Sequence, residues 1–546
     1  MIIDYLDGRP RKSFSADTNT HKKRKSGGIY KLLSLGECLR VAALTRICDN
    51  YVLRFDRRGY EGAMTWPDGA SHSHIRREDL VKRLVVYIPH WSDMAGILFD
   101  EFVAWLKSKE ALFSSATTLM VSMCGRGQFT KLPKREKLIS VAAATDKELA
   151  VSLGHSLLQL TPTAAGVIVS FSECGDRYRM CNELMSELCR GNVTRVLVES
   201  RTPRPLIAFR ILGVSGLTRI IQGSNTHSSS FAHVAYANAS TLKDLSISSV
   251  TERQWHILIY GHKNIPVVYE SLARLTMEVV KTPRHKAWTA INDEVSFPSL
   301  LTLDISGQYL FEDGLLYRGN GKTLMNLCVP PNALAKNLFS QFGILSRNGV
   351  TRMNSIHIGR AIFYGQVSLP ANMDAPIEQQ IRCILRVATT LCIYRSFLIR
   401  DNLLAALCSA PTTAALRHLT VEHQFFDLAG ILQVIAALPS LVSITSDIRG
   451  RVERVDEIPE SQQPSALHAK HYPLSRNFRT LRALDTTDMI TDQLSIIAMQ
   501  IAIVCPRFTF MDVCICIRSN FVQNVSLAMV DGPFQPYADS IRRLIE

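Results

Sequence analysis

A six-residue pattern of apolar positions recurs along this chain. Its first, fourth and sixth residues are apolar, and the residues between them are of any type. Strict copies, with leucine at the first two places, begin at Leu242, Leu272, Leu300, Leu324 and Leu416. Chance gives about one or two strict copies in a chain of this composition. The last two apolar residues are two apart, so they lie on one face of a short strand, which must stack on copies of itself to bury that face.

The spacing of strict and loose copies indicates a repeat. From residue 193 the copies begin at 217, 242, 272, 300, 324 and 353, at intervals of 24 to 30 residues. Leucine-rich repeats have periods of about 20–29 residues. Helical spacing appears between strands, at residues 333–342, 403–408, 428–438 and 491–504. We therefore expect an α/β fold, a leucine-rich-repeat-like solenoid with parallel strands on one face and helices on the other.

The array is expected to be irregular, because the asparagine that follows the strand in regular leucine-rich repeats is missing from most copies. We expect a basic flexible segment at residues 1–28, a small helical cap and linker at 29–80, and a solenoid of roughly a dozen repeats at 81–546. A polar, proline-containing run at 449–472 is predicted to be an exposed loop.

The composition is that of a folded protein that has no strongly charged surface and that binds other macromolecules. Hydrophobic residues make up 47% and charged residues 20% of the chain, which excludes a disordered protein. The 62 Lys and Arg residues exceed the 48 Asp and Glu residues by 14. This positive charge is spread along the chain beyond residue 30, so we do not expect nucleic acid as the partner.

Cysteine use and hydropathy indicate an intracellular protein. The 13 cysteines are scattered singly, several of them within apolar runs: Cys383, Cys392, Cys408 and Cys505. Such cysteines behave as small buried hydrophobes, and we expect no disulfide framework. The two most apolar stretches, 151–171 and 494–505, are too polar or too short to cross a bilayer, and no signal peptide is expected at the start. We expect a monomer in the cytoplasm, the nucleus or both.

Two basic blocks lie near the start of the chain, at Arg9–Lys12 and Lys22–Lys25. Their spacing resembles a bipartite nuclear-import signal, in which two short cationic segments occupy acidic grooves of a carrier. The residues that would make these contacts are Arg11, Lys12, Lys22, Lys23, Arg24 and Lys25. A solvated charged loop is the alternative interpretation.

Candidate chemistry is sparse, and we expect no catalytic residue, cofactor or metal. The run Gly319–Thr323 lacks the glycine of a phosphate loop, since that position is Leu316. The pairs His72/His74 and His468/His471 have no further ligands at zinc-like spacing. Cys514/Cys516 on a strand and Cys174/Cys181/Cys189 on one helical face fit core packing better than metal binding. No nucleophile elbow is present. We therefore do not expect an enzyme.

Several phrases resemble a family expanded in kickxellalean fungi, whose members are leucine-rich-repeat-like proteins with an F-box-like start. The runs Phe297–Ile305, Tyr309–Asp313 and Tyr317–Leu324 are similar to the recurring repeat of that family. So are His471–Pro473, Arg476–Arg479, Ala502–Pro506 and Phe534–Tyr537 near the end of the chain and Cys38–Arg40 near its start. The resemblance covers nearly the whole chain and carries no catalytic motif.

An F-box is a short helical unit that docks onto the adaptor of a cullin ubiquitin ligase. The resemblance implies that residues 29–55 would meet this adaptor, through Leu32, Leu35, Cys38, Leu39 and Leu44, and that residues 1–28 are a remnant of the F-box start. The chain would then be a protein-interaction module, and the resemblance implies the role of a substrate receptor of the ligase. The alternative is a scaffold repeat protein with a degenerate F-box, because the Leu-Pro dipeptide and most of the first helix of the family are missing.

Overall fold

The computed structural model describes residues 50–54, 80–88, 103–104, 106–108, 110–123, 143–171, 178–200, 215–222, 229–250, 252–261, 265–279, 296–307, 323–329, 353–359, 374–394, 400–409, 414–448, 473–483, 491–508 and 510–513. The chain divides into two compact units, Met1–Ser249 and Val250–Glu546. Each unit is an α/β structure built on parallel strands.

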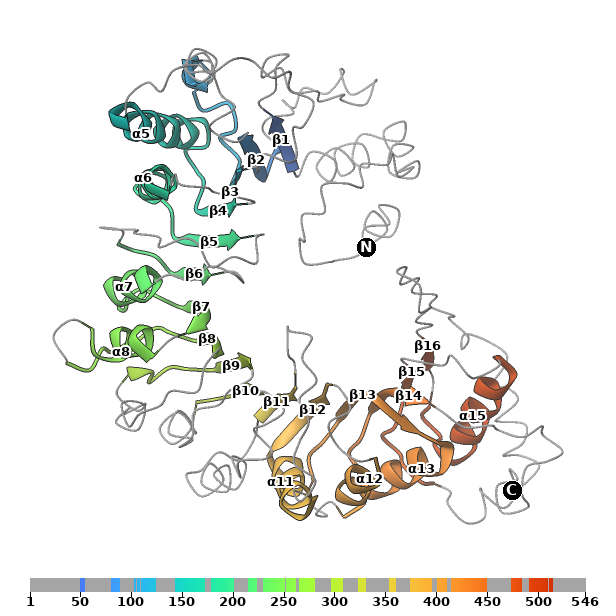
Figure 1. The fold of residues 1–546 in the computed structure, drawn as a ribbon. Coiled ribbons are helices and arrows are strands. Elements are labelled where there is room, and N and C mark those ends of the chain that lie inside the picture. The colour runs from blue at the N-terminus through green and yellow to red at the C-terminus, as the bar shows by residue number, and fades with distance from the viewer. Residues whose placement is uncertain are drawn as a thin grey trace, which may run out of the picture. The chain divides into compact units, whose positions relative to one another are not determined.

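The first unit contains a parallel sheet whose strands follow one another in sequence order (Figure 1). Its strands are β1 (Asn50–Arg54), β2 (Arg83–Ile88), β3 (Thr118–Met123), β4 (Gly166–Phe171), β5 (Arg195–Ser200), β6 (Arg219–Gln222) and β7 (Asp244–Val250). Its helices are α5 (Ala143–Leu160), α6 (Tyr178–Leu188) and α7 (Ser229–Ala237). Such an order, with each strand beside its predecessor, is that of a solenoid.

The second unit repeats this plan. Its strands are β8 (Arg274–Val279), β9 (Thr302–Gly307), β10 (Asn326–Val329), β11 (Met353–Ile358), β12 (Ala388–Ile393), β13 (His418–Phe426), β14 (Ser443–Ile448), β15 (Thr480–Ala483) and β16 (Phe510–Val513). Its helices are α8 (Glu252–Tyr260), α11 (Asp374–Val387), α12 (Arg400–Cys408), α13 (Leu428–Ala437) and α15 (Thr491–Val504). Again every strand pairs in parallel with the next.

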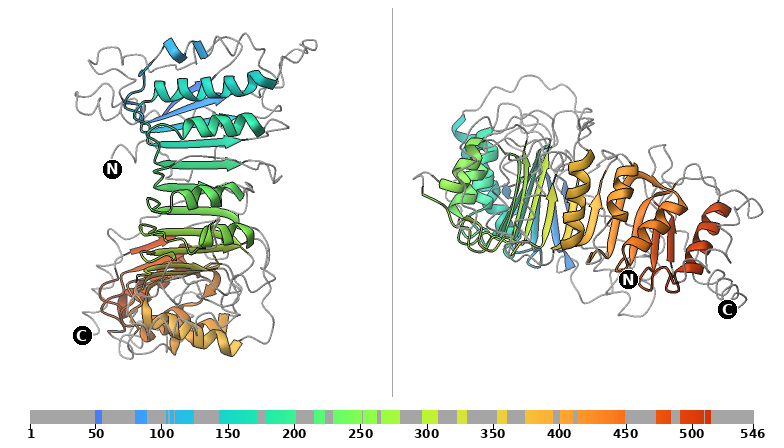
Figure 2. Two further views of the ribbon diagram at one scale, coloured as in Figure 1. Left: turned by 90° about the vertical axis from the view of Figure 1, so that its left-hand side faces the viewer. Right: turned by 90° about the horizontal axis from the view of Figure 1, so that it is seen from below.

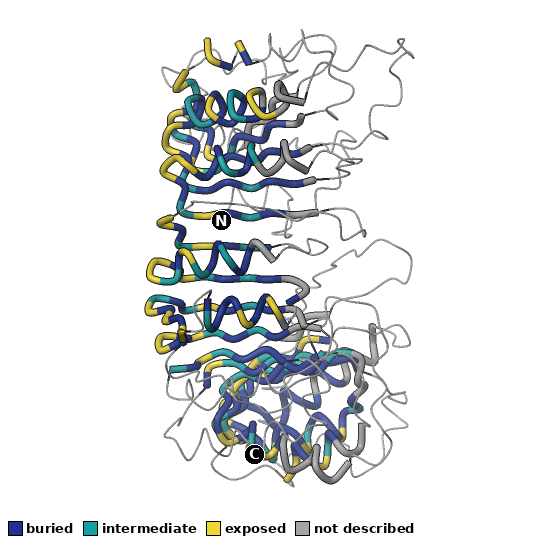
Figure 3. The backbone as a smooth tube through the Cα atoms, turned by 60° about the vertical axis from the view of Figure 1, so that its left-hand side comes forward, coloured by how far each residue is buried: buried dark blue, intermediate teal, exposed yellow. Residues whose placement is uncertain are grey.

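The described helices of each unit lie on one face of its sheet (Figures 1 and 2). The apolar residues of the repeat pattern stand in register across neighbouring strands, as Leu275, Leu303 and Leu327 do. All three are buried, and the turns before the strands carry most of the exposed residues (Figure 3). The predicted α/β fold with an open parallel sheet and helices on one side is confirmed.

Backbone hydrogen bonds lock the start of each strand to the preceding repeat. The residue after the first apolar position of each repeat donates its N–H to the carbonyl of the equivalent residue one repeat earlier; Met325 donates to Leu301 at 2.8 Å and Val442 to Arg417 at 2.7 Å. Threonine often strengthens this link. The hydroxyls of Thr218 and Thr241 donate to Thr194 and Leu217 carbonyls at 3.1 and 2.9 Å. Hydroxyl-to-backbone bonds of this kind recur where the asparagine ladder is missing.

One boundary differs from the prediction. Residues 50–54, at the end of the predicted helical unit 29–55, form β1 and pair in parallel with β2. Tyr51, Val52 and Leu53 are residues common in strands, and the neighbouring β2 offers backbone partners. The sheet therefore begins before residue 81. The other residues predicted as a cap, the predicted helix 333–342, the loop 449–472 and the segment 1–28 lie outside the described residues.

The helix predictions at 403–408, 428–438 and 491–504 are confirmed by α12, α13 and α15. In α13 the side chain of Asp427 caps the first turn, where its Oδ1 accepts from the N–H of Gly430 at 2.8 Å. The helix ends at Ala437, two residues before Pro439, which could not continue it because proline has no backbone N–H to donate. Among the described residues, no helix is long and apolar enough to span a membrane.

The described cysteines are free thiols, and most of them are buried as predicted: Cys189, Cys328, Cys392 and Cys505. Cys383 is half-buried. The prediction of a buried Cys408 is wrong, because this residue is exposed in the last turn of α12, off the buried face that Leu403, Ala406 and Leu407 form. Cys189, at the end of α6, follows a helix that packs against α5, which explains its burial.

Burial predicts different reactivities for two of these thiols. Burial raises the pKa of Cys189 to about 12, and partial desolvation also raises the pKa of Cys408. Since both thiols are protonated at neutral pH, their accessibility to the reagent determines the rate of alkylation. We expect iodoacetamide to modify Cys408 in the native protein at least about tenfold faster than Cys189, with equal rates in denaturant. Peptide mass spectrometry would measure this, and equal native rates would contradict the packing of α5 on α6.

Candidate functional site

The helix-free face of the second unit is lined by two rows of mainly polar side chains, which we call the polar face. They alternate with the buried apolar residues and therefore point away from the helices. The first row is Arg274, Thr302, Asn326, Ser355, Thr390, His418, Ser443 and Thr480. The second row is Thr276, Asp304, Cys328, His357, Cys392, Thr420, Thr445 and Arg482.

Hydrogen bonds join side chains of the first row across the strands. The Asn326 carboxamide donates to the Thr302 hydroxyl at 3.3 Å, and Asn326 Oδ1 accepts from the Ser355 hydroxyl at 2.9 Å. Further along, His418 Nδ1 and Ser443 Oγ are 2.8 Å apart. Side chains held this way lose little further entropy when a partner binds, which favours recognition.

A second cluster lies in the middle of the polar face. His357 Nδ1 is 3.1 Å from the Tyr394 hydroxyl, and the two rings are stacked with centroids 5.9 Å apart. Cys328 and Cys392 flank His357 on the neighbouring strands, and both are buried. In the described part of the chain, no group of three or more His, Cys, Asp or Glu residues is arranged to hold a metal ion. The cluster therefore offers hydrogen bonds and an aromatic surface.

The helix-free face of the first unit has a different character. Its row equivalent to the second row of the polar face is apolar: Val85, Met120, Ile168, Leu197 and Ile221. Val85 and Met120 are each 5% exposed. Beside this row an ion pair joins β6 and β7, where Arg219 Nε and Asp244 Oδ2 are 3.0 Å apart. From β2 to β6 this row is therefore apolar, with Ser246 following in β7, whereas the matching row of the second unit is mainly polar.

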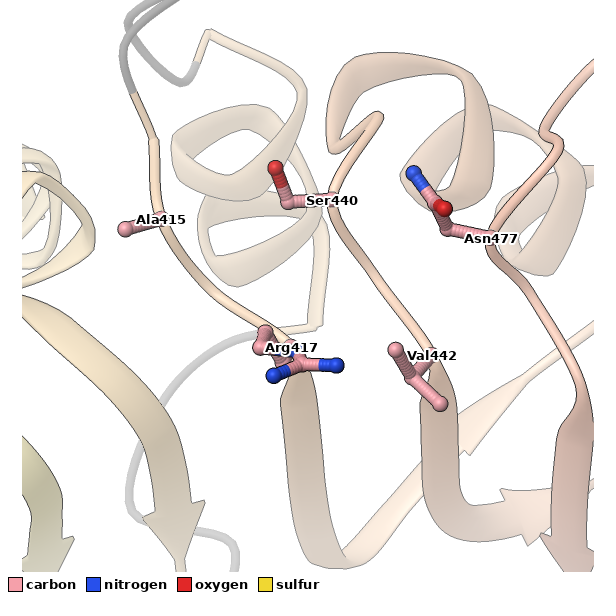
Figure 4. Close-up of a pocket in the computed structure, with 5 residues that line it drawn as sticks. All are labelled: Ala415, Arg417, Ser440, Val442 and Asn477. Atoms are coloured by element: carbon pink, nitrogen blue, oxygen red, sulfur yellow. The ribbon is translucent and has the colours of Figure 1, made fainter.

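A groove opens beside the polar face, where the chain enters β13, β14 and β15 (Figure 4). It has a volume of about 260 Å³ and is lined by Ala415, Arg417, Ser440, Val442 and Asn477. The Arg417 side chain extends toward Val442, with Ser440 and Asn477 on the next two repeats (Figure 4). The Asn477 carboxamide donates to the Pro439 carbonyl at 2.9 Å, which fixes that side of the groove.

Arg417 also acts on the neighbouring histidine of the polar face. Partial desolvation, and secondarily the positive charge of Arg417, lower the pKa of His418 below its ordinary value of 6.5. Because the folded form has the lower pKa, protonation favours the unfolded chain as the pH falls below 6.5.

Substitution of Arg417 is therefore expected to change the titration of His418. In Arg417→Gln the pKa of His418 should rise toward its ordinary value, because the repulsion of the imidazolium is removed. Titration of the His418 ring proton by NMR would measure the shift, with Arg386→Gln on α11 as a control that leaves it unchanged. A pKa that falls or stays constant in Arg417→Gln would contradict the assigned geometry.

The site residues predicted from the sequence lie outside the described residues. These are the F-box-like positions Leu32, Leu35, Cys38, Leu39 and Leu44 and the import-signal positions 11, 12 and 22–25. Cys174, Cys181, His72, His74, His468, His471, Cys514 and Cys516 also lie outside them or outside the described side chains. Of the phosphate-loop candidate only Thr323 is described, and its hydroxyl donates to the Leu300 carbonyl at 3.0 Å, as in the other repeats.

Sequence reasoning missed the polar face and the groove. Both are built from the positions between the apolar residues of the repeat, which were treated as spacers. A signal was present, because aligning the repeats on their second leucine places Thr302, Asn326, Ser355 and Thr390 in one column. Reading that column across strands would have predicted the first row.

Together, an open parallel sheet, helices on one side and a polar helix-free face define the protein as an α/β repeat protein of the solenoid class. No protein-family model matches the chain, and no curated protein matches its sequence.

Proposed function

We propose that the protein is a protein–protein interaction module that binds its partner through the polar face of the second unit. One observation carries this proposal: across eight neighbouring strands, the helix-free face presents hydroxyl, amide, imidazole and charged side chains, several of them hydrogen-bonded to one another. Repeat proteins use such extended faces to bind macromolecules without catalytic groups. Large exposed apolar residues near the same face, Leu301 and Met325, add contact area.

A bulky charged residue placed on the polar face tests this proposal. Thr420 is half-buried in the second row, between Cys392 and Thr445, and Ala436 is exposed on helix α13. With the whole protein as bait in an extract of the cells that express it, a partner retained by the wild type should be retained by Ala436→Arg and lost with Thr420→Arg. Circular dichroism would establish that both variants fold. Equal retention by the two variants, for every protein captured, would reject the proposal.

A finer form of this proposal concerns the adaptor of a cullin ubiquitin ligase. It rests on the resemblance of residues 29–55 to an F-box-like unit, with Leu35 and Leu39 among the contacts. Calorimetry with the purified adaptor is the direct test. We expect micromolar or tighter binding that Leu35→Asp abolishes, and no heat of binding with the wild type would remove the role as a substrate receptor.

The second candidate is a scaffold role, in which the N-terminal region acts as a cap. It is favoured by β1, because residues 50–54 of the proposed adaptor-binding unit are part of the sheet. Exposed ends of a solenoid sheet need such protection. Deletion of residues 1–49, which leaves β1 in place, should then lower solubility and thermal stability without the loss of one particular partner. A deletion that removes only adaptor binding would favour the first candidate.

A further inference from the structure

The residue after the first apolar position of each repeat forms a row at the side of the polar face where the strands begin, which we call the leading row. In the second unit its members are Ala273, Leu301, Met325, Asn354, Thr389, Arg417, Val442 and Arg479. The backbone hydrogen bonds described above connect these positions from repeat to repeat, so their spacing follows the strand spacing. The row is a fixed line of side chains that crosses eight repeats.

The first part of this line is apolar and exposed. Leu301 is 40% and Met325 46% exposed, and the Met325 N–H donates to the Leu301 carbonyl at 2.8 Å, so the two side chains belong to adjacent repeats. The other large apolar residues exposed in the described part of the chain, Ile265 and Val268, precede β8, the strand that pairs with β9. Clustering of this kind marks a contact surface, whereas single exposed apolar residues do not.

The last part of the line is positively charged. Arg417 and Arg479 are both exposed and lie on either side of Val442, and the N–H groups of Val442 and Arg479 donate to the preceding carbonyls at 2.7 and 2.8 Å. Neither guanidinium has an ion pair or a side-chain hydrogen bond within the described ranges. The leading row of the second unit contains no Asp or Glu. Between the two arginines, Ser440 and Asn477 line the groove with hydroxyl and amide groups.

We infer that the leading row binds an extended acidic segment of a protein partner, with one apolar residue against Leu301 and Met325 and carboxylates at Arg417 and Arg479. Planar guanidinium groups bind carboxylates with two parallel hydrogen bonds, and the hydroxyl and amide of the groove supply further donors. This inference rests on the proposed function and adds the chemistry and the location of the partner.

The strand spacing fixes the sequence pattern of that segment. Strands lie about 4.8 Å apart, so Arg417 is about 14 Å from Met325, three strands away, and Arg479 about 10 Å from Arg417. An extended chain rises about 3.3 Å per residue. The first acidic residue should therefore follow the apolar one by about four positions and the second acidic residue by about three more.

A protein segment fits this line better than a nucleic acid does. Two arginines at one end are too few to follow a phosphate backbone along the row, and the lining residues of the groove include no aromatic ring on which a base could stack. The apolar part at Leu301 and Met325 has no counterpart in the binding of single-stranded nucleic acids through their phosphates.

The probe is a fluorescein-labelled peptide, Leu-Ser-Ser-Ser-Glu-Ser-Ser-Glu, titrated with the full-length protein and followed by fluorescence anisotropy at low salt. We expect saturable binding that weakens at least about tenfold in the double variant Arg417→Glu/Arg479→Glu, because two attractions become repulsions. The control Arg253→Glu/Arg386→Glu makes the same charge change on exposed residues of α8 and α11 and should keep the wild-type affinity. A peptide with lysine in place of both glutamates should not bind.

The apolar contact is tested by a double-mutant cycle. Met325→Ser and replacement of the peptide leucine by serine should each weaken binding, and the combined effect should be smaller than the sum. Absence of peptide binding to the wild type, or equal binding by the double arginine variant, would overturn the inference. So would an oligo(dT) probe that binds in an arginine-dependent manner while the peptide does not. If the inference fails in one of these ways, the Thr420→Arg experiment still tests the proposed function separately. Loss of a captured partner in Thr420→Arg would support the proposed function, and unchanged capture of every partner would reject it.

Discussion

Replacement of Leu303 by alanine is expected to lower the free energy of unfolding by about 2–5 kcal/mol, the range for truncation of a fully buried leucine. Leu303 is 0% exposed at the second apolar position of β9, in register with Leu275 and Leu327. The cavity cannot close easily, because both neighbours are held by strand pairing on either side of β9. Urea unfolding of the full-length protein, followed by circular dichroism, would measure the loss.

Leu301 provides a matched control two residues away. It lies in the leading row and is 40% exposed, so Leu301→Ala should change stability by less than about 0.5 kcal/mol. In a repeat array each repeat contacts only its neighbours, so hydrogen exchange in Leu303→Ala should accelerate in β8, β9 and β10 first. Equal destabilisation by the two substitutions would mean that the assignment of buried and exposed positions in β9 is wrong.

The buried rows could be predicted from the sequence because one physical rule determines them. Leucines at the first two apolar positions, as in Leu300 and Leu303, have no means of burial except against the same positions of adjacent repeats. The period-two alternation then assigns each residue to the helix side or to the helix-free side. Helices such as α15 were predicted to the residue because both a helical period and a terminating proline were present.

Other features depend on contacts between repeats that a single pattern does not contain. The leading-row hydrogen bonds use backbone groups, which any residue possesses. The residue types at these positions therefore do not indicate them. The exposure of Cys408 depends on how α12 is rotated about its axis, and a run of leucines and alanines does not fix that rotation. β1 was missed because its five residues belong to no copy of the leucine pattern. Pairing with β2 through the backbone is sufficient to form it.

The boundary between the two units was also invisible in the sequence. The strict copies at Leu242 and Leu272 fall on either side of Ser249, and the period continues across it. What changes is the helix-free face, whose second row is apolar in the first unit and mainly polar in the second. The difference between the units therefore lies in the residues between the apolar positions, and the apolar positions themselves do not show it.

The side chain of Asn238 hydrogen-bonds buried backbone groups at one place in the array, as the asparagines of regular leucine-rich repeats do in every repeat. It is 0% exposed in the turn after α7, where its Oδ1 accepts the N–H of Leu217 at 2.9 Å and its Nδ2 donates to the Val234 carbonyl at 2.8 Å. The side chain thereby joins the end of α7 to the start of its own repeat at Leu217. Leu217 itself begins the run into β6 and is fully buried, so its N–H cannot turn to water.

Asn238→Leu is therefore expected to destabilise the protein by about 1–3 kcal/mol, because the side chain keeps its branched shape while a buried N–H loses its acceptor. Asn477→Leu is the matched control, since Asn477 also donates to a backbone carbonyl but is exposed, and its partner Pro439 can be hydrated instead. That change should stay below about 0.5 kcal/mol. Urea denaturation gives both values, and hydrogen exchange at the Leu217 amide should rise only in Asn238→Leu. A variant as stable as the wild type, with Leu217 still protected, would show that another group accepts this hydrogen bond and that the link between α7 and the start of its repeat does not depend on Asn238.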